Sequence, residues 1–159
     1  MNWSELLSPS GDIALSDGER SLNYFELLQE IRIKKDWLMS LNVSVVALDM
    51  ENSIDWILLD MAAMEANITL IPIPSFFTDA QRTHALNLAG VELVLTDKQG
   101  DTSTVTIFST IYVQRRQSDQ PEFPENTSKV TYTSGSTGTP KGVCLSSESM
   151  LSTAKALVK

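Results

Sequence analysis

Three short apolar segments, separated by two predicted helices, most strongly restrict the fold of this 159-residue chain. They are "SVVALD" at 44–49, "ITLIPIP" at 68–74 and "VELVLTD" at 91–97. Short apolar runs rich in β-branched residues are typical of strands buried on both faces. The stretches between them, 54–66 and 79–89, are predicted to be helices. This order predicts an α/β fold, with a parallel-rich sheet covered by helices.

Residues that favour helix ends mark where the predicted helices begin and stop. Expected caps are Asn23, Asn52 or Ser53, and Thr78 at helix starts, with Asn67 and Gly90 at helix ends. The helix after Asn23 should cover 24–40, with Glu26 in its first turn. Before it, residues 12–22 predict a short hairpin around an Asp17-Gly18 turn.

The predicted secondary structure changes after the third apolar segment. Residues 98–113 favour two antiparallel strands, and 115–128 is a polar stretch with two prolines, typical of a connector. Residues 129–159 predict a strand, a loop, a second strand and a helix. We therefore expect one partial domain over 1–159, whose N-terminal α/β part is 1–114.

Composition narrows the class of protein. A hydrophobic fraction of 42% supplies a core for a domain of this size. The single cysteine excludes an internal disulfide and favours a reducing compartment. We see neither a signal peptide nor an apolar run of the roughly 20 residues needed to cross a bilayer. A cytoplasmic protein without a membrane span is expected, and the net charge of −8 disfavours nucleic acid as a partner.

Positive charge is concentrated near the C-terminal end. Residues 129–159 have a net charge of +3, whereas the rest of the chain has −11. This distribution suits an anionic small ligand. A solvated face of lysines is the alternative that composition leaves open.

The stretch "TYTSGSTGTPKGVCL", residues 131–145, has the chemistry of a phosphate-binding loop. Gly135 and Gly138 permit unusual backbone conformations and let a ligand approach closely. Successive N–H groups in such a loop can form an anion-binding concavity, and Lys141 adds a positive charge. A mobile linker of the same composition is the alternative. The predicted flanking strands and the Pro-Lys-Gly ending argue against it.

The Walker A loop is a second alternative, and the sequence departs from it. The spacing from Gly135 to Lys141 fits, but Pro140 replaces the second glycine and removes an N–H. Gly142 stands where Walker A has the Ser or Thr that holds magnesium. "GVCL" is also typical of a strand, whereas Walker A begins a helix.

The segment "YTSGSTGTPKGV", residues 132–143, resembles the phosphate-loop signature of the adenylate-forming superfamily. This superfamily includes acyl-CoA synthetases, luciferases and nonribosomal peptide adenylation domains. Residues 51–97 are similar in order and spacing to its N-terminal region, although Asn67 stands where glycine is usual. Ser147 stands where many members have a histidine. The resemblance implies the N-terminal subdomain of that fold, since family enzymes continue for several hundred residues.

The resemblance also implies a ligase activity. An AMP-forming acyl-CoA synthetase or acid ligase converts a carboxylic acid and ATP with Mg²⁺ to acyl-adenylate and pyrophosphate. The acyl group then passes to coenzyme A or another thiol. The ATP phosphate-binding residues that it implies are Thr133, Ser134, Gly135, Ser136, Thr137, Gly138, Thr139 and Lys141.

No catalytic residue and no metal ligand is identified within these 159 residues, so we expect the fragment alone to be inactive. A non-catalytic nucleotide-binding or interaction module, such as a truncated paralogue or a split subunit, is the alternative function. The expected partners are a small carboxylic acid and ATP. A homodimer, or a missing C-terminal portion, would cover the apolar surface that such a piece leaves exposed.

The other chemistry-bearing residues have structural interpretations. We expect His84 at a helix surface and Cys144 as a small buried hydrophobe. Asp49, Asp55 and Asp60 lack the dense spacing of oxygen ligands around a hard cation. We expect them to be helix-end and surface charges.

Overall fold

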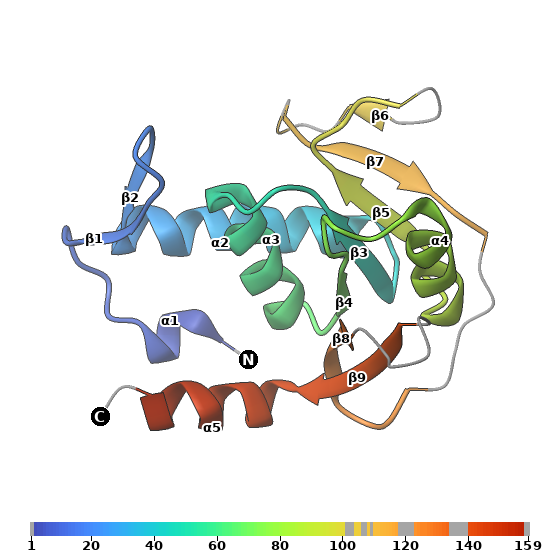
Figure 1. Cartoon of the computed structure of the whole chain (residues 1–159). Helices are drawn as coiled ribbons and strands as arrows, with labels where there is room; N and C mark the ends of the chain where they lie inside the picture. Colours follow the sequence, from blue (N-terminus) through green and yellow to red (C-terminus); the bar gives the residue numbers. More distant parts are fainter. Residues whose placement is uncertain are drawn as a thin grey trace. The chain divides into compact units, whose positions relative to one another are not determined.

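The computed structural model describes residues 2–100, 104–105, 108, 110–117, 123–133 and 140–157. The chain divides into two compact units, each with its own internal packing (Figure 1). The first unit comprises Met1–Val43 and Glu51–Ile68, and the second comprises Ser44–Met50 and Thr69–Lys159. Whether the functional segments divide at 114 and 128 stays a prediction.

The first unit contains a hairpin and helices. Its elements are α1 (Trp3–Leu6), β1 (Ile13–Ser16), β2 (Ser21–Asn23), α2 (Tyr24–Ser40) and α3 (Ile54–Glu65). β1 and β2 pair antiparallel, and Gly18 in their turn has a φ of 93°. The Asp17 carboxylate accepts from the N–H groups of Arg20 and Glu19, which lowers the pKa of Asp17. The predicted hairpin is confirmed.

Helix boundaries in this unit follow the predicted caps. Asn23 and Glu26 form a reciprocal capping box at the start of α2. Ser53, rather than Asn52, caps α3, because its hydroxyl oxygen accepts from the N–H of Trp56 at 3.1 Å. Asn67, just beyond α3, has a φ of 56°, the left-handed conformation that this residue tolerates.

A charged network joins α2, α3 and the hairpin. The Lys34 side chain is only 2% exposed, and its Nζ lies 3.0 Å from Glu30 and 3.4 Å from Asp55. Asp55 also lies 3.5 Å from Arg20 of the hairpin. A buried ammonium is costly without such partners, so this network favours one packing arrangement of these elements.

The second unit is built on a mixed seven-stranded sheet with the order β6-β7-β5-β3-β4-β8-β9 (Figure 1). The strands are β3 (Val45–Asp49), β4 (Thr69–Pro72), β5 (Leu93–Thr96), β6 (Thr104–Val105), β7 (Tyr112–Arg115), β8 (Thr127–Thr133) and β9 (Lys141–Ser146). β3 pairs parallel with β4 and β5, and β4 pairs parallel with β8. β7 pairs antiparallel with β5 and β6, and β9 pairs antiparallel with β8. The predicted α/β fold with a parallel-rich centre is confirmed.

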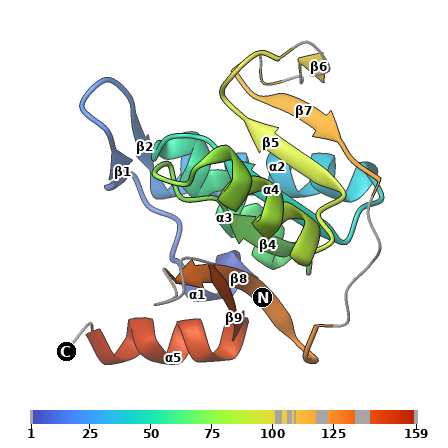
Figure 2. The same cartoon turned by 45° about the vertical axis from the view of Figure 1, so that its right-hand side comes forward.

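Helix α4 (Asp79–Leu88) packs on this sheet, and α5 (Ser147–Leu157) follows β9 directly (Figure 2). Ala85 and Leu86 of α4 belong to a buried cluster with sheet residues that include Ala47 and Val130. Thr78 caps α4, as the sequence predicts, and it also forms a capping box with Gln81. Gly90, with a φ of 55°, follows its C-terminal end.

The burial predicted for Cys144 is wrong. Cys144 lies on β9, and its thiol is exposed. β9 is the last strand in the sheet order, with β8 as its neighbour. Because the predicted strand is an edge strand, its apolar sequence does not place its side chains in a core.

We predict that a side chain at position 142 destabilises the β8–β9 hairpin. A Cβ there would lie 3.0 Å from Cγ1 of Val130, which is buried in the core cluster and has little room to move. Gly11 is a matched control, because nothing lies within 4 Å of a Cβ added there. We expect Gly142→Ala to unfold with a free energy about 1 kcal/mol below that of Gly11→Ala, measured by urea denaturation. Equal unfolding free energies would contradict this packing.

Candidate functional site: the loop between β8 and β9

β8 and β9 hold the two ends of the glycine-rich loop together. Thr133 is the pairing partner of Lys141, and Tyr132 is the partner of Gly142. The hydroxyl of Thr133 donates to the carbonyl oxygen of Lys141 at 3.5 Å. Of the predicted phosphate-binding residues, the structure places Thr133 and Lys141. The rest, Ser134–Thr139, lie outside the described residues.

Lys141 brings an available positive charge to the base of this loop. Its side chain is exposed, at the first position of β9. Among the ion pairs between residues that the structure describes, none involves Lys141. An exposed ammonium without a carboxylate partner can meet an anionic ligand without first breaking an ion pair.

The position of the loop within the sheet also suits a ligand. β8 runs parallel to β4, and β4 runs parallel to β3, so these strands end at the same edge of the sheet. The loop therefore leaves β8 at the carboxyl edge of the parallel strands. In open α/β sheets, this edge is where ligands bind.

Tyr132 holds the end of β8 against α4. Its hydroxyl donates to the carbonyl oxygen of Ala85 at 2.8 Å, and its ring packs edge-on against Phe77 at 6.2 Å between ring centroids. Burial, and secondarily the charge of nearby Cys144, raises the pKa of Tyr132 to about 12. Tyr132 lies within the loop signature, but the sequence predicts no separate role for it. Its partner comes from another element, so no local signal reveals this anchoring function.

One carboxylate near this edge forms an ion pair. Asp49, at the end of β3, accepts from Nε of Arg82 on α4 at 2.6 Å. The interpretation of Asp49 as a surface charge was therefore incomplete, because sequence spacing does not reveal this partner. His84 is exposed on α4, as predicted.

The described residues were searched for metal-binding clusters and for membrane-spanning helices. Within the described part of the chain, no group of three or more His, Cys, Asp or Glu residues could hold a metal ion. A search of the same part finds no helix long and apolar enough to cross a membrane.

A match to a family model identifies the family of this chain. The AMP-binding enzyme family matches residues 6–159, a span that includes the loop and most of both units. The chain belongs to this family. The predicted membership of the adenylate-forming superfamily is therefore confirmed.

Curated relatives in this family are much longer than the chain. It is 29% identical over 144 residues to the nonribosomal peptide synthetase pboA of Aspergillus ustus, covering 83% of this chain and 7% of that protein. It is 27% identical over 156 residues to the anguibactin system regulator of Vibrio anguillarum, covering 91% of this chain and 15% of that protein. The chain thus spans a small part of the length of these relatives.

Solved structures show the same fold. The chain matches the o-succinylbenzoate-CoA synthetase MenE of Bacillus subtilis, in complex with its acyl-adenylate intermediate, with a TM-score of 0.72 and 20% identity. That match covers 97% of this chain and 44% of MenE. The Klebsiella oxytoca NpsA N-terminal subdomain, in complex with 3-hydroxybenzoyl-AMSN, matches with a TM-score of 0.65 and 21% identity, over 90% and 38% of the two chains. The predicted fold, the N-terminal subdomain of adenylate-forming enzymes, is confirmed.

We predict that one of the three tyrosines ionises late. Alkaline titration followed by tyrosinate absorbance should show one group with a pKa of about 12, which is absent in Tyr132→Phe. Because the pKa in the folded protein lies above the usual 10.0, the stability linked to this phenol is complete below pH 10 and is lost as the pH rises toward about 12. If all tyrosines of the folded protein titrate together near pH 10, Tyr132 is not anchored as described.

Proposed function

We propose that this chain is the N-terminal part of an AMP-forming acyl-CoA synthetase or related acid ligase. In this proposal, the whole protein activates a carboxylic acid with MgATP to acyl-adenylate and pyrophosphate. It then passes the acyl group to a thiol, either coenzyme A or another acceptor. The observation that most supports the proposal is the pairing of Thr133 with Lys141, in a chain that belongs to the AMP-binding enzyme family.

The loop would act on the phosphates of ATP. Lys141 would contribute a full charge, and the hydroxyls of Ser134, Ser136 and Thr137 would donate hydrogen bonds to phosphate oxygens. Stabilising pyrophosphate as it leaves is electrostatic catalysis, because negative charge accumulates on the leaving group. Bound Mg²⁺ would neutralise part of that charge, chiefly through the phosphate oxygens themselves. Support for this ligand comes from MenE, whose structure has also been solved with ATP and magnesium ion.

The 159 residues alone would not carry out the reaction. A phosphate-binding loop without an adenine pocket makes only some of the contacts by which a protein holds a nucleotide. We therefore propose weak MgATP binding and no acyl-adenylate formation by this chain in isolation. We also propose a cytoplasmic location, which the free, exposed thiol of Cys144 favours.

A non-catalytic nucleotide-binding or interaction module is the second candidate. One observation favours it: α5 has no buried residue among those described, and apolar side chains are exposed on α5 and β9. Val143 is 43% exposed and Leu157 is 80% exposed. A partner chain, a second copy or further sequence of the same protein would each remove this apolar surface from water.

We predict that Lys141→Ala, made in the longer protein that contains this chain, slows adenylation. Loss of the charge at the leaving pyrophosphate should reduce ATP–pyrophosphate exchange by roughly 100-fold or more. Lys155→Ala is the matched control, since Lys155 is an exposed lysine in the last turn of α5. An unchanged rate of ATP–pyrophosphate exchange in Lys141→Ala would contradict the proposed role of this lysine. If exchange is lost in both variants, the cause is the general loss of positive charge and not a specific role of Lys141.

A separate prediction concerns the purified 159-residue chain. Incubation with carboxylic acids and MgATP should yield no acyl-AMP, and micromolar MgATP should leave the thermal unfolding midpoint almost unchanged. Acyl-AMP detected by mass spectrometry would refute inactivity. A large thermal stabilisation at micromolar MgATP would show that the nucleotide pocket is already complete.

A further inference from the structure

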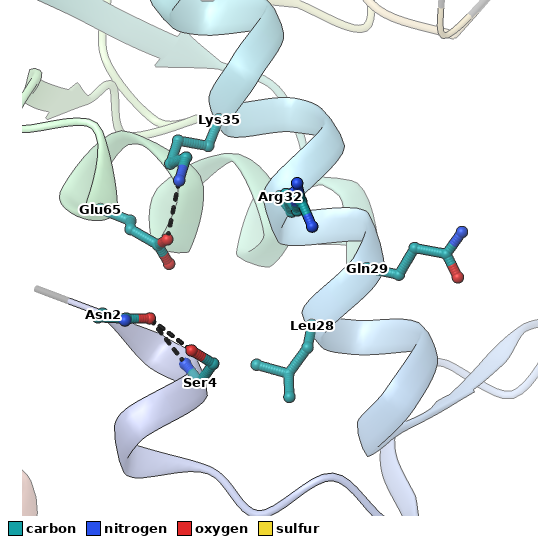
Figure 3. Close-up of a pocket in the computed structure, with 7 residues that line it drawn as sticks. All are labelled: Asn2, Ser4, Leu28, Gln29, Arg32, Lys35 and Glu65. Atoms are coloured by element: carbon teal, nitrogen blue, oxygen red, sulfur yellow. Dashed lines mark hydrogen bonds and ion pairs between the residues drawn. The ribbon is translucent and has the colours of Figure 1, made fainter.

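A second candidate site lies in the first unit, outside the phosphate loop. A cavity of about 460 Å³ opens among α1, α2 and the C-terminal end of α3 (Figure 3). This volume lies within the range of small-molecule sites. Trp3 fixes one wall of the cavity, because its indole Nε1 donates to the carbonyl oxygen of Met61 on α3 at 2.8 Å.

The charges of the side chains that line the cavity do not sum to zero. Arg32 and Lys35 come from adjacent turns of α2, and Glu65 comes from the end of α3. Lys35 Nζ lies 3.1 Å from Glu65 Oε1, so these two charges compensate each other. Among the ion pairs and side-chain hydrogen bonds of the described residues, none involves Arg32. The lining therefore leaves one positive charge, on a planar guanidinium with five N–H donors.

An apolar contact lies beside this guanidinium. Leu28 precedes Arg32 by four residues, so the two side chains share one face of α2. Figure 3 shows Leu28 projecting from α2 toward Ser4, whereas Gln29 points away from the other lining residues. The hydroxyl of Ser4 donates to Oδ1 of Asn2 at 2.7 Å, so its oxygen can still accept a hydrogen bond.

We propose that this cavity binds a small organic monocarboxylate with an apolar body. The carboxylate would pair with the guanidinium of Arg32 through two parallel hydrogen bonds, and the apolar body would lie against Leu28. One uncompensated positive charge matches a single negative charge. The Glu65 carboxylate in the same lining disfavours ligands of higher negative charge, such as inorganic phosphate. This site does not depend on the proposed function, because none of its residues belongs to the phosphate loop.

Benzoate is a suitable probe of this site, and benzamide is its neutral control of the same shape. Titration of the ¹⁵N-labelled chain with benzoate should give saturable shifts of the backbone amides around Leu28 and Arg32. Arg32→Gln should weaken benzoate binding at least about tenfold, because it removes a charge-assisted bidentate pair. Arg115→Gln, which removes an exposed arginine from β7, should bind benzoate like the unaltered chain.

Arg32 is exposed, so Arg32→Gln should fold normally, and an unchanged thermal unfolding midpoint would verify this. The proposal is overturned if benzoate shows no saturable binding at millimolar concentration, or if Arg32→Gln binds it equally well. Benzamide or inorganic phosphate binding as tightly as benzoate would overturn the ligand class. Shifts that centre on Lys141 rather than Arg32 would place benzoate in the phosphate loop and overturn this site.

Discussion

The antiparallel pairing of β8 with β9 fixes the two ends of the loop on which the proposed function depends. Thr133 and Lys141 lie opposite each other, so the two ends of the loop are about one strand spacing apart. β8 is held in turn by its parallel pairing with β4 and by the hydrogen bond from Tyr132 to α4. These contacts place Lys141 and the end of β8 at the carboxyl edge of the parallel strands.

Electrostatics distinguish Lys141 from the lysines of the first unit. Lys34 and Lys35 both form ion pairs, with Glu30, Asp55 and Glu65, and so help hold helices together. Lys141 has no such ion pair among the described residues, although the chain as a whole carries a net charge of −8. An unpaired cation in an acidic chain is better suited to binding an anion than to stabilising the fold.

Features encoded locally were predictable from the sequence, and features that need a distant partner were not. The caps of α2 and α4 and the glycine turn of the hairpin depend on neighbouring residues, and all were confirmed. The exposure of Cys144 depends on β9 lying at the sheet edge, which an apolar run cannot reveal. Likewise, the Arg82–Asp49 ion pair joins residues far apart in sequence. The loop signature predicts a phosphate ligand, because its glycines, hydroxyls and lysine are residues that bind phosphate, and this ligand stays a prediction.

The most direct test of this account is a titration of the ¹⁵N-labelled chain with magnesium pyrophosphate, observed by NMR. Pyrophosphate carries the charge that the loop is proposed to bind, without adenine or acid. The account predicts chemical-shift changes concentrated at Thr133, Lys141 and Gly142 and in the loop between them, weakening as salt is added because the contact is largely electrostatic. Absence of changes there, or changes spread evenly over the lysines of the chain, would contradict a phosphate-binding role for this loop.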